Sequence, residues 1–261
     1  MSGDREIRAD GGIRAGREIR AGREIRASAE GYRDDAGAAD ERVAAALEAY
    51  AAGRGTEREV LIALASARLL VPVVAVLGEQ ADDGSDKDSA MALPTLIGND
   101  GRAAIIAFTG LAALTAWRPD ARPIPVEAGR VWQAAVAEDQ PAGPVSPVSP
   151  AGPAGAVVVD VAGPVPVVVE GARLAALAAG QPPPAPHEDP DIRAEVEAAI
   201  VPENAIAGAR VTAGRAGGDL AVQFVVRPET DWEQAVQRAA TRLSRGLAPR
   251  LRRGIEVSAA R

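Results

Sequence analysis

Hydrophobic residues recur along the chain at two different periods, and the switch between them predicts an α+β protein. Residues 40–52 and 56–65 carry apolar side chains at helical spacing. Apolar runs typical of strands occur at 69–77, 92–97, 103–108, 156–161 and 165–170. Helical spacing returns at 110–117, 127–137 and 171–180. We therefore expect mixed or antiparallel sheets with helices packed on them.

Polar residues at the ends of these runs predict how the elements begin and end. Thr56 and Glu59 have the spacing of a capping box, and Thr109 is a candidate N-cap for the helix that follows it. Gly98-Asn-Asp-Gly101 is typical of a hairpin turn. Pro72 lacks an N–H group, so we expect its strand to lie at a sheet edge or to begin near this residue.

The proline-rich run Gln181-Pro-Pro-Pro-Ala-Pro186 predicts a stiff linker over residues 181–189. Before it, residues 38–180 form the first predicted domain, with a flexible insert of Pro, Gly and Ser at 141–155. After it, residues 190–261 form a second small domain. Its predicted elements are a helix at 191–200, strands at 205–212 and 220–226, a helix at 231–247 and a strand at 255–258. This order favours a small antiparallel sheet with its helices on one face.

Residues 1–37 contain an imperfect repeat in which Gly-Arg-Glu-Ile-Arg-Ala occurs twice in succession, at 16–21 and 22–27. A six-residue period matches no helical stripe, and a glycine in every unit disfavours a helix. We predict a disordered N-terminal extension; whether it is translated, or serves as a charged interaction tail, stays open.

Composition excludes several classes of function. The chain has no cysteine, which excludes disulfides, thiolate catalysis and cysteine–zinc sites. A net charge of -7 argues against nonspecific nucleic-acid binding, and no apolar run approaches the length of a membrane helix. The start of the chain has no apolar core of a signal peptide, so we expect a cytoplasmic protein.

The sequence contains no recognisable catalytic constellation. Its only histidine, His187, lies in the predicted linker, and neither Lys87 nor the glycines at 214–218 form a nucleotide-binding motif. We therefore expect a protein that is not an enzyme and has no cofactor.

Two charged segments are candidate interaction surfaces. The first is an acidic loop, in which carboxylates could bind a hard cation, contact a partner or simply face solvent. Its residues are Asp82, Asp83, Asp86, Lys87 and Asp88. The second is a basic face around the last predicted helix, which could bind an acidic partner or reflect only the preference of cations for a helix C-terminus. Its residues are Arg238, Arg242, Arg245, Arg250, Arg252 and Arg253.

Three segments resemble the SseB family, named for enhanced serine sensitivity, and most closely its actinobacterial members. They are Leu69-Leu-Val-Pro-Val-Val-Ala75, Asp86-Lys-Asp-Ser-Ala-Met-Ala92 and Ala104-Ile-Ile-Ala-Phe-Thr-Gly-Leu-Ala-Ala-Leu114. The resemblance covers about residues 40–180 and extends, in weaker form, to the family's C-terminal domain. It implies an α+β fold and brings no catalytic residues, because the function of the family is unsettled.

These observations favour a non-enzymatic binding or regulatory protein with a protein partner, acting without nucleic acid or membrane; its oligomeric state stays open. One alternative is a metal-dependent enzyme that uses only the carboxylates of the acidic loop. Another is a secretion-associated factor, a reading that rests only on a name shared with type III secretion proteins.

Overall fold

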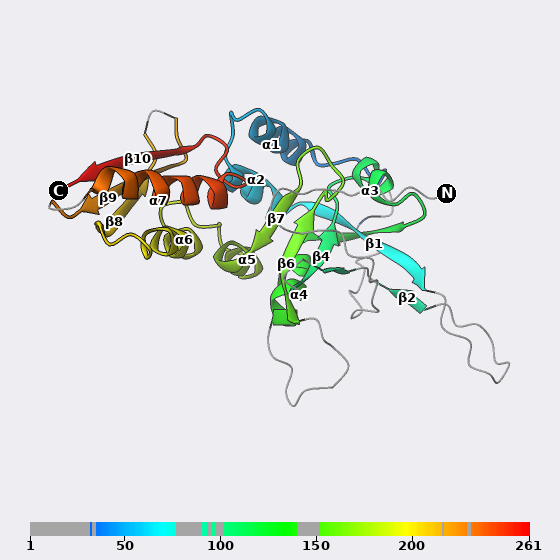
Figure 1. Cartoon of the computed structure of the whole chain (residues 1–261). Coiled ribbons are helices and arrows are strands. Elements are labelled where there is room, and N and C mark those ends of the chain that lie inside the picture. The colour runs from blue at the N-terminus through cyan, green and yellow to red at the C-terminus, as the bar shows by residue number, and fades with distance from the viewer. Residues whose placement is uncertain are drawn as a thin grey trace, which may run out of the picture. The chain divides into compact units, whose positions relative to one another are not determined.

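The computed structural model describes most of the chain, and its contacts divide it into two compact units (Figure 1). The described residues are 32, 35–76, 90–92, 95–97, 102–139, 152–215, 217–228 and 231–261. The first unit consists of the described residues up to Ala44 together with Leu64–Gln181. The second consists of Ala45–Ala63 together with Pro182–Arg261. The predicted N-terminal extension, apart from Tyr32 and residues 35–37, lies outside the described residues, and so does most of the predicted insert.

The first unit contains two sheets, with strand orders β2-β1-β5 and β3-β4-β6-β7. The strands are β1 (Arg68–Val76), β2 (Ala90–Ala92), β3 (Thr95–Ile97), β4 (Arg102–Ala107), β5 (Arg122–Glu127), β6 (Gly152–Val159) and β7 (Val167–Glu170). The helices that begin in this unit after Leu64 are α3 (Leu111–Trp117), α4 (Ala128–Asp139) and α5 (Gly171–Ala178). Strands β4 and β6 are parallel and the other pairs are antiparallel, which confirms the predicted α+β fold with mixed sheets.

Aliphatic side chains and a few rings fill the core of the first unit. Trp132 of α4 and Phe108 after β4 are fully buried, and the ring of Phe108 contacts that of Trp117 at a centroid distance of 5.5 Å. Buried valines of β6 and Ile106 of β4 complete the core between the sheet and the helices. Such a core is stabilised by many small apolar contacts.

In the part of the chain that the structure describes, two helices precede β1: α1 (Glu41–Ala51) and α2 (Glu57–Leu64). The predicted capping box at the start of α2 is confirmed. The amide of Glu59 donates to Thr56 Oγ1 at 3.2 Å, and the amide of Thr56 donates to Glu59 Oε2 at 2.7 Å.

The second unit also contains a three-stranded sheet, with the order β10-β9-β8. Its elements after the linker are α6 (Pro190–Ile200), β8 (Ile206–Ala213), β9 (Leu220–Val226), α7 (Trp232–Leu247) and β10 (Ile255–Ala260). Strands β8 and β9 are antiparallel, as predicted, whereas β10 is parallel to β9. The parallel pairing arises because α7 carries the chain back along the sheet before β10 begins. The predicted all-antiparallel sheet of this domain is therefore wrong in one pair.

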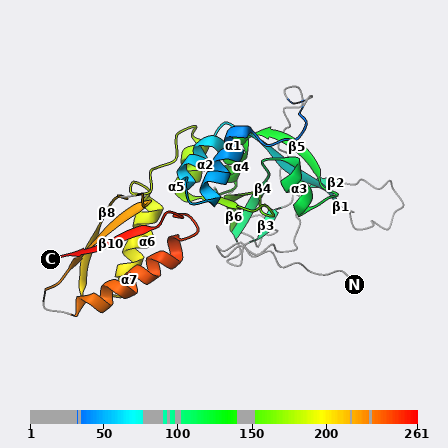
Figure 2. The ribbon, with the colours of Figure 1, turned by 90° about the horizontal axis from the view of Figure 1, so that it is seen from above.

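Both helices of this sheet lie on one of its faces (Figure 2). Buried residues of α6, such as Ile192 and Val196, join those of α7, such as Leu243, in one cluster with Leu220 and Phe224 of β9. The opposite, helix-free face of the sheet carries the alternate residues of each strand, and neither α6 nor α7 lies on it.

Several local predictions differ from the structure. Thr109 is not the N-cap of α3; Gly110 occupies that position, and Thr109 hydrogen-bonds elsewhere. Strand β1 begins before Pro72 and lies between two strands, but only β5 pairs with it at Pro72. Residues 122–127, for which the sequence predicted no strand, form the edge strand β5 although it contains Pro123 and Pro125. An edge strand tolerates proline because half of its ladder positions need no N–H donor.

The predicted domain boundary also differs from the observed grouping. Residues 45–63 were expected to belong to the first domain, within 38–180, yet their contacts place them in the second unit. The reason is visible in three hydrogen bonds. Tyr50 Oη donates to the carbonyl of Pro249 at 2.6 Å, Arg58 Nε donates to that of Pro183 at 2.9 Å, and Arg250 pairs with Glu57.

Candidate functional site

The predicted acidic loop cannot be placed, because Asp82, Asp83, Asp86, Lys87 and Asp88 lie outside the described residues. Cation binding by this loop stays a prediction.

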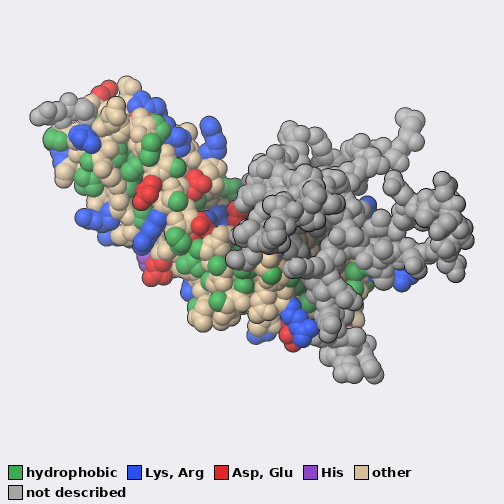
Figure 3. All heavy atoms as spheres, turned by 90° about the horizontal axis from the view of Figure 1, so that it is seen from below, with side chains coloured by type: hydrophobic (Ala, Val, Ile, Leu, Met, Phe, Trp, Pro, Cys, Tyr) green, Lys and Arg blue, Asp and Glu red, His purple; other side chains and the backbone are tan. Residues whose placement is uncertain are grey.

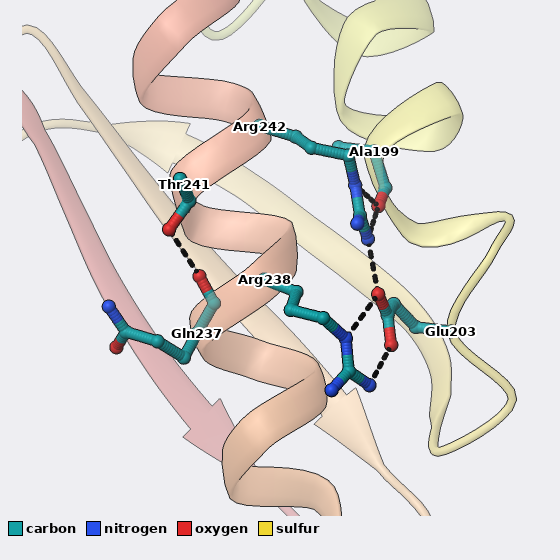
Figure 4. A network of polar contacts seen from close by, with 6 residues as sticks. All are labelled: Ala199, Glu203, Gln237, Arg238, Thr241 and Arg242. Atoms are coloured by element: carbon teal, nitrogen blue, oxygen red, sulfur yellow. Dashed lines mark hydrogen bonds and ion pairs between the residues drawn. The ribbon is translucent and has the colours of Figure 1, made fainter.

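Two arginines of the predicted basic face meet at one buried carboxylate. Arg238 and Arg242 project from α7 toward Glu203, which lies between α6 and β8 (Figure 4). Arg238 donates to both oxygens of Glu203, at 3.1 and 2.6 Å, and Arg242 donates to Oε1 at 2.6 Å. Arg242 also donates to the carbonyl of Ala199 at 3.0 and 2.7 Å. Hydrogen bonds from Arg238 and Arg242 lower the pKa of Glu203 to about 2.

A third arginine of this set forms a different ion pair. Arg250, whose side chain is 16% exposed, contacts Glu57 Oε2 at 3.3 Å and Asp189 Oδ2 at 2.5 Å. The guanidinium of Arg252 lies 4.7 Å from the ring centroid of Tyr50, a cation–π contact. These contacts join the segment between α7 and β10 to α1, α2 and the linker within the second unit.

The remaining two residues of the set, Arg245 and Arg253, are exposed. Arg253 donates its backbone N–H to Asp219 Oδ2 at 2.8 Å, and Arg245 is exposed in the last turn of α7. The structure thus brings together Arg238 with Arg242, and places Arg250 and Arg252 elsewhere in contact with α1 and α2. Basic and acidic side chains are interspersed on the described part of the face seen in Figure 3.

The helix-free face of the C-terminal sheet carries a different set of polar residues. Strand pairing aligns Thr212, Ala221 and Glu256 in one row across β8, β9 and β10. The next row consists of Arg210, Gln223 and Ser258. Because alternate residues share a face, these six side chains lie on the side opposite α6 and α7.

These rows surround a hollow of about 370 Å³. Its lining residues come from all three strands and from the turn after β8: Arg210, Thr212, Arg215, Ala221, Val222, Gln223, Glu256, Val257 and Ser258. Ala221 has the smallest side chain in its row and belongs to the central strand, whereas the longer side chains of Arg210, Arg215 and Glu256 belong to the flanking segments. This size difference accounts for the hollow.

The carboxylate at the hollow is held by the turn between β8 and β9. Glu256 Oε1 accepts the backbone N–H of Arg215 at 2.7 Å. A Cβ atom on Gly218 would lie 2.8 Å from the same oxygen, so a larger residue there would displace the carboxylate of Glu256 from this position. A Cβ atom on Gly214 would lie 2.2 Å from the carbonyl oxygen of Gly218, which explains the first glycine of the turn.

The charged groups of the hollow do not neutralise one another. Among the described residues, the guanidinium groups of Arg210 and Arg215 make neither a hydrogen bond nor an ion pair, and Glu256 pairs with neither of them. Arg210 and Arg215 are both exposed. The hollow therefore presents two cationic groups and one anionic group to a ligand.

Sequence reasoning missed this site. The sequence predicted strands at 205–212, 220–226 and 255–258, but the row that joins Arg210 to Ser258 depends on the register of all three strands. The available signal was a pair of polar residues two positions apart in each outer strand, Arg210 with Thr212 and Glu256 with Ser258.

The first unit contains one further buried acid, Asp160, which follows β6. Asp160 accepts hydrogen bonds from the amide and the hydroxyl of Thr109, at 2.9 and 2.7 Å, and burial raises the pKa of its carboxyl. Its backbone φ of 53° lies in the left-handed region that residues other than glycine rarely adopt. Both oxygens are thus engaged in fixing the turn between β4 and α3.

Two further observations concern the described residues alone. They contain no group of three or more His, Cys, Asp or Glu side chains arranged to hold a metal ion. None of their helices combines the length and the apolar character needed to cross a membrane.

Comparison with known proteins identifies one match. The model of the family described as the SseB protein N-terminal domain matches residues 43–176, just over half of the 261 residues. No curated protein and no solved structure matches the chain.

Proposed function

The chain belongs to the SseB family, and from this premise we propose that it is a non-catalytic binding protein whose ligand occupies the helix-free face of the C-terminal sheet. The observation that carries the proposal is the hollow beside Glu256, where the guanidinium groups of Arg210 and Arg215 have no hydrogen-bond or ion-pair partner among the described residues. Charged groups on a concave surface that the fold does not use are typical of a binding site.

Other acidic side chains of the protein differ from Glu256 because their carboxylates are engaged by neighbouring residues, and this contrast supports the proposal. Glu203 is held by two arginines, Asp189 is paired with Arg250, and Asp160 is hydrogen-bonded to Thr109. These acids stabilise the fold, and none of the three lines the hollow that contains Arg210 and Arg215. The predicted protein partner, the carboxylate-based enzyme and the secretion factor stay predictions.

Equilibrium dialysis against a small-molecule extract of the cells that express the protein tests the proposal. Both compartments are analysed by mass spectrometry, with the purified full-length chain in one of them. We expect at least one compound to accumulate on the protein side while its total amount stays constant, because binding without turnover consumes nothing.

Variants assign the accumulated compound to the hollow. The double change Arg210→Ala with Arg215→Ala should abolish the accumulation, and Arg245→Ala, which removes an exposed arginine from α7, should preserve it. A fall in total compound with a new product would show catalysis. No accumulation, or equal accumulation with the double variant, would also contradict the proposed function.

A further inference from the structure

We propose that the hollow on the helix-free face binds a small zwitterionic molecule, with its phosphate or carboxylate group between Arg210 and Arg215 and its amine at Glu256. This inference rests on the proposed function and adds the chemical class of the ligand. Its starting point is the set of three charges that share one hollow without pairing with one another.

The anionic half of the ligand follows from the two arginines. A guanidinium binds carboxylate and phosphate oxygens through parallel N–H donors, and two guanidinium groups at one hollow can hold a single anion from two sides. The hydroxyls of Thr212 and Ser258 line the same hollow and can donate to the remaining oxygens. Ala221 at the centre leaves space for the group.

The cationic half follows from Glu256. Its Oε1 already accepts the backbone N–H of Arg215, which fixes the carboxylate at the hollow. An anion that entered alone would be repelled by this negative charge. A ligand that also carries an amine converts the repulsion into attraction, so the same carboxylate then favours binding.

The size of the hollow indicates a small molecule. About 370 Å³ lies at the lower end of the range of roughly 300–1,000 Å³ that is usual for small-molecule sites. Apart from the buried Val222, the lining residues are exposed or half-buried, and charged contacts at such a surface are weakened by salt. We therefore expect modest affinity that falls as ionic strength rises.

Matched pairs of probes test the inference on the full-length protein. O-phosphoethanolamine and ethyl phosphate differ by the amine, as do β-alanine and propionate, and ethanolamine provides the amine alone. Each is titrated at constant ionic strength, and binding is followed by the NMR signals of Thr212, Ala221, Gln223 and Ser258. We expect the zwitterion of at least one pair to bind about tenfold more tightly than its amine-free partner, because the amine adds a charge-assisted hydrogen bond to Glu256.

The variant Glu256→Gln should affect the amine-free probes and the zwitterionic probes in opposite directions. Glutamine retains an oxygen that accepts the N–H of Arg215, so the turn should keep its shape, which the NMR spectrum checks. Removal of the negative charge should strengthen binding of ethyl phosphate or propionate severalfold and abolish the advantage of the zwitterion. Arg210→Ala with Arg215→Ala should abolish binding of both, and Arg245→Ala should change neither.

Three results would overturn the inference: equal affinity within both probe pairs, equal weakening of all probes by Glu256→Gln, or unchanged binding to the double arginine variant. The outcome is separable from that of the proposed function. If these probes fail while dialysis still retains a compound that requires Arg210 and Arg215, the ligand class is wrong and the binding function stands. If the probes bind as expected and dialysis retains nothing, the site stands without the proposed function.

Discussion

At the scale of single residues, the role of each arginine depends on whether a carboxylate lies within hydrogen-bonding distance of its guanidinium group. Glu203 is almost fully buried, and a buried carboxylate is stable only when donors replace the water it has lost. Arg238 and Arg242 supply three hydrogen bonds to its two oxygens. Among the described residues, the guanidinium groups of Arg210 and Arg215 have no such acceptor, which leaves them available for a ligand.

Glu203→Gln should change how stability depends on pH. The pKa of Glu203 is lowered from 4.5 to about 2, so its ionised form stabilises the fold above about pH 4.5, and this contribution is lost as pH falls from 4.5 toward 2. We expect the variant to be less stable at neutral pH and to lose less stability across this interval. Thermal unfolding at a series of pH values, followed by NMR signals of α7, measures both effects.

A matched control uses an acid in a different environment. Glu48 is 81% exposed and lies 3.8 Å from Arg54, so Glu48→Gln should follow the wild-type pH profile. A Glu203→Gln profile parallel to that of the wild type would show that the two arginines do not hold a charged carboxylate.

Sequence alone could not assign these roles. The spacing of Arg238 and Arg242 correctly indicated a shared side of the helix, as both reach Glu203. Their partner lies 35 and 39 positions away, and those of Arg250 lie 61 and 193 positions away. Local patterns predict the helix face but not which charges are neutralised across such separations.

At the scale of elements, local signals succeeded where the determining contacts are local. The capping box of α2 involves residues three positions apart and was predicted from the sequence. Thr109, in contrast, has the composition of an N-cap, but its side chain donates to Asp160, 51 positions away. Strand β5 was not predicted, because its two prolines are atypical of a strand and only its pairing with β1 makes it one.

The contact between Asp160 and Thr109 joins the ends of two parallel strands, β4 and β6, and can be tested by substitution. Asp160→Ala leaves the buried amide of Thr109 without an acceptor and places alanine at a φ of 53°. We expect a loss of about 2 kcal/mol in the free energy of unfolding of the first unit. Hydrogen exchange of the amides in β4 and β6 localises the effect.

Asparagine at the same position provides the control. It tolerates left-handed backbone and offers one oxygen to the amide of Thr109, so Asp160→Asn should cost less than half as much as Asp160→Ala. Equal losses for the two variants would indicate that hydrogen bonding by this side chain does not hold the turn.

At the scale of the whole molecule, the proline-rich linker marks a boundary in sequence but not the full extent of the second unit. The C-terminal elements were predicted within a few residues, because each has its own periodicity. The membership of α2 was not predictable, since it depends on single contacts such as that between Glu57 and Arg250. The second unit is therefore assembled from two separate stretches of the chain.

This division predicts that a fragment of residues 182–261 will bind a peptide of residues 41–64. In the fragment alone, Arg250 keeps Asp189 but lacks Glu57, and the carbonyl of Pro249 loses the hydroxyl of Tyr50. We expect the peptide to raise the melting temperature of the fragment, with a dissociation constant at least about tenfold weaker for Glu57→Gln, since one partner of a half-buried ion pair is then missing. Isothermal titration calorimetry measures the affinity. A Glu48→Gln peptide should bind like the original, because the side chain of Glu48 is 81% exposed and its ion-pair partner Arg54 lies within the peptide. Failure of the original peptide to bind a folded fragment would show that Ala45–Ala63 do not belong to the second unit, whereas equal affinity of the Glu57→Gln peptide would show only that the ion pair does not hold them there.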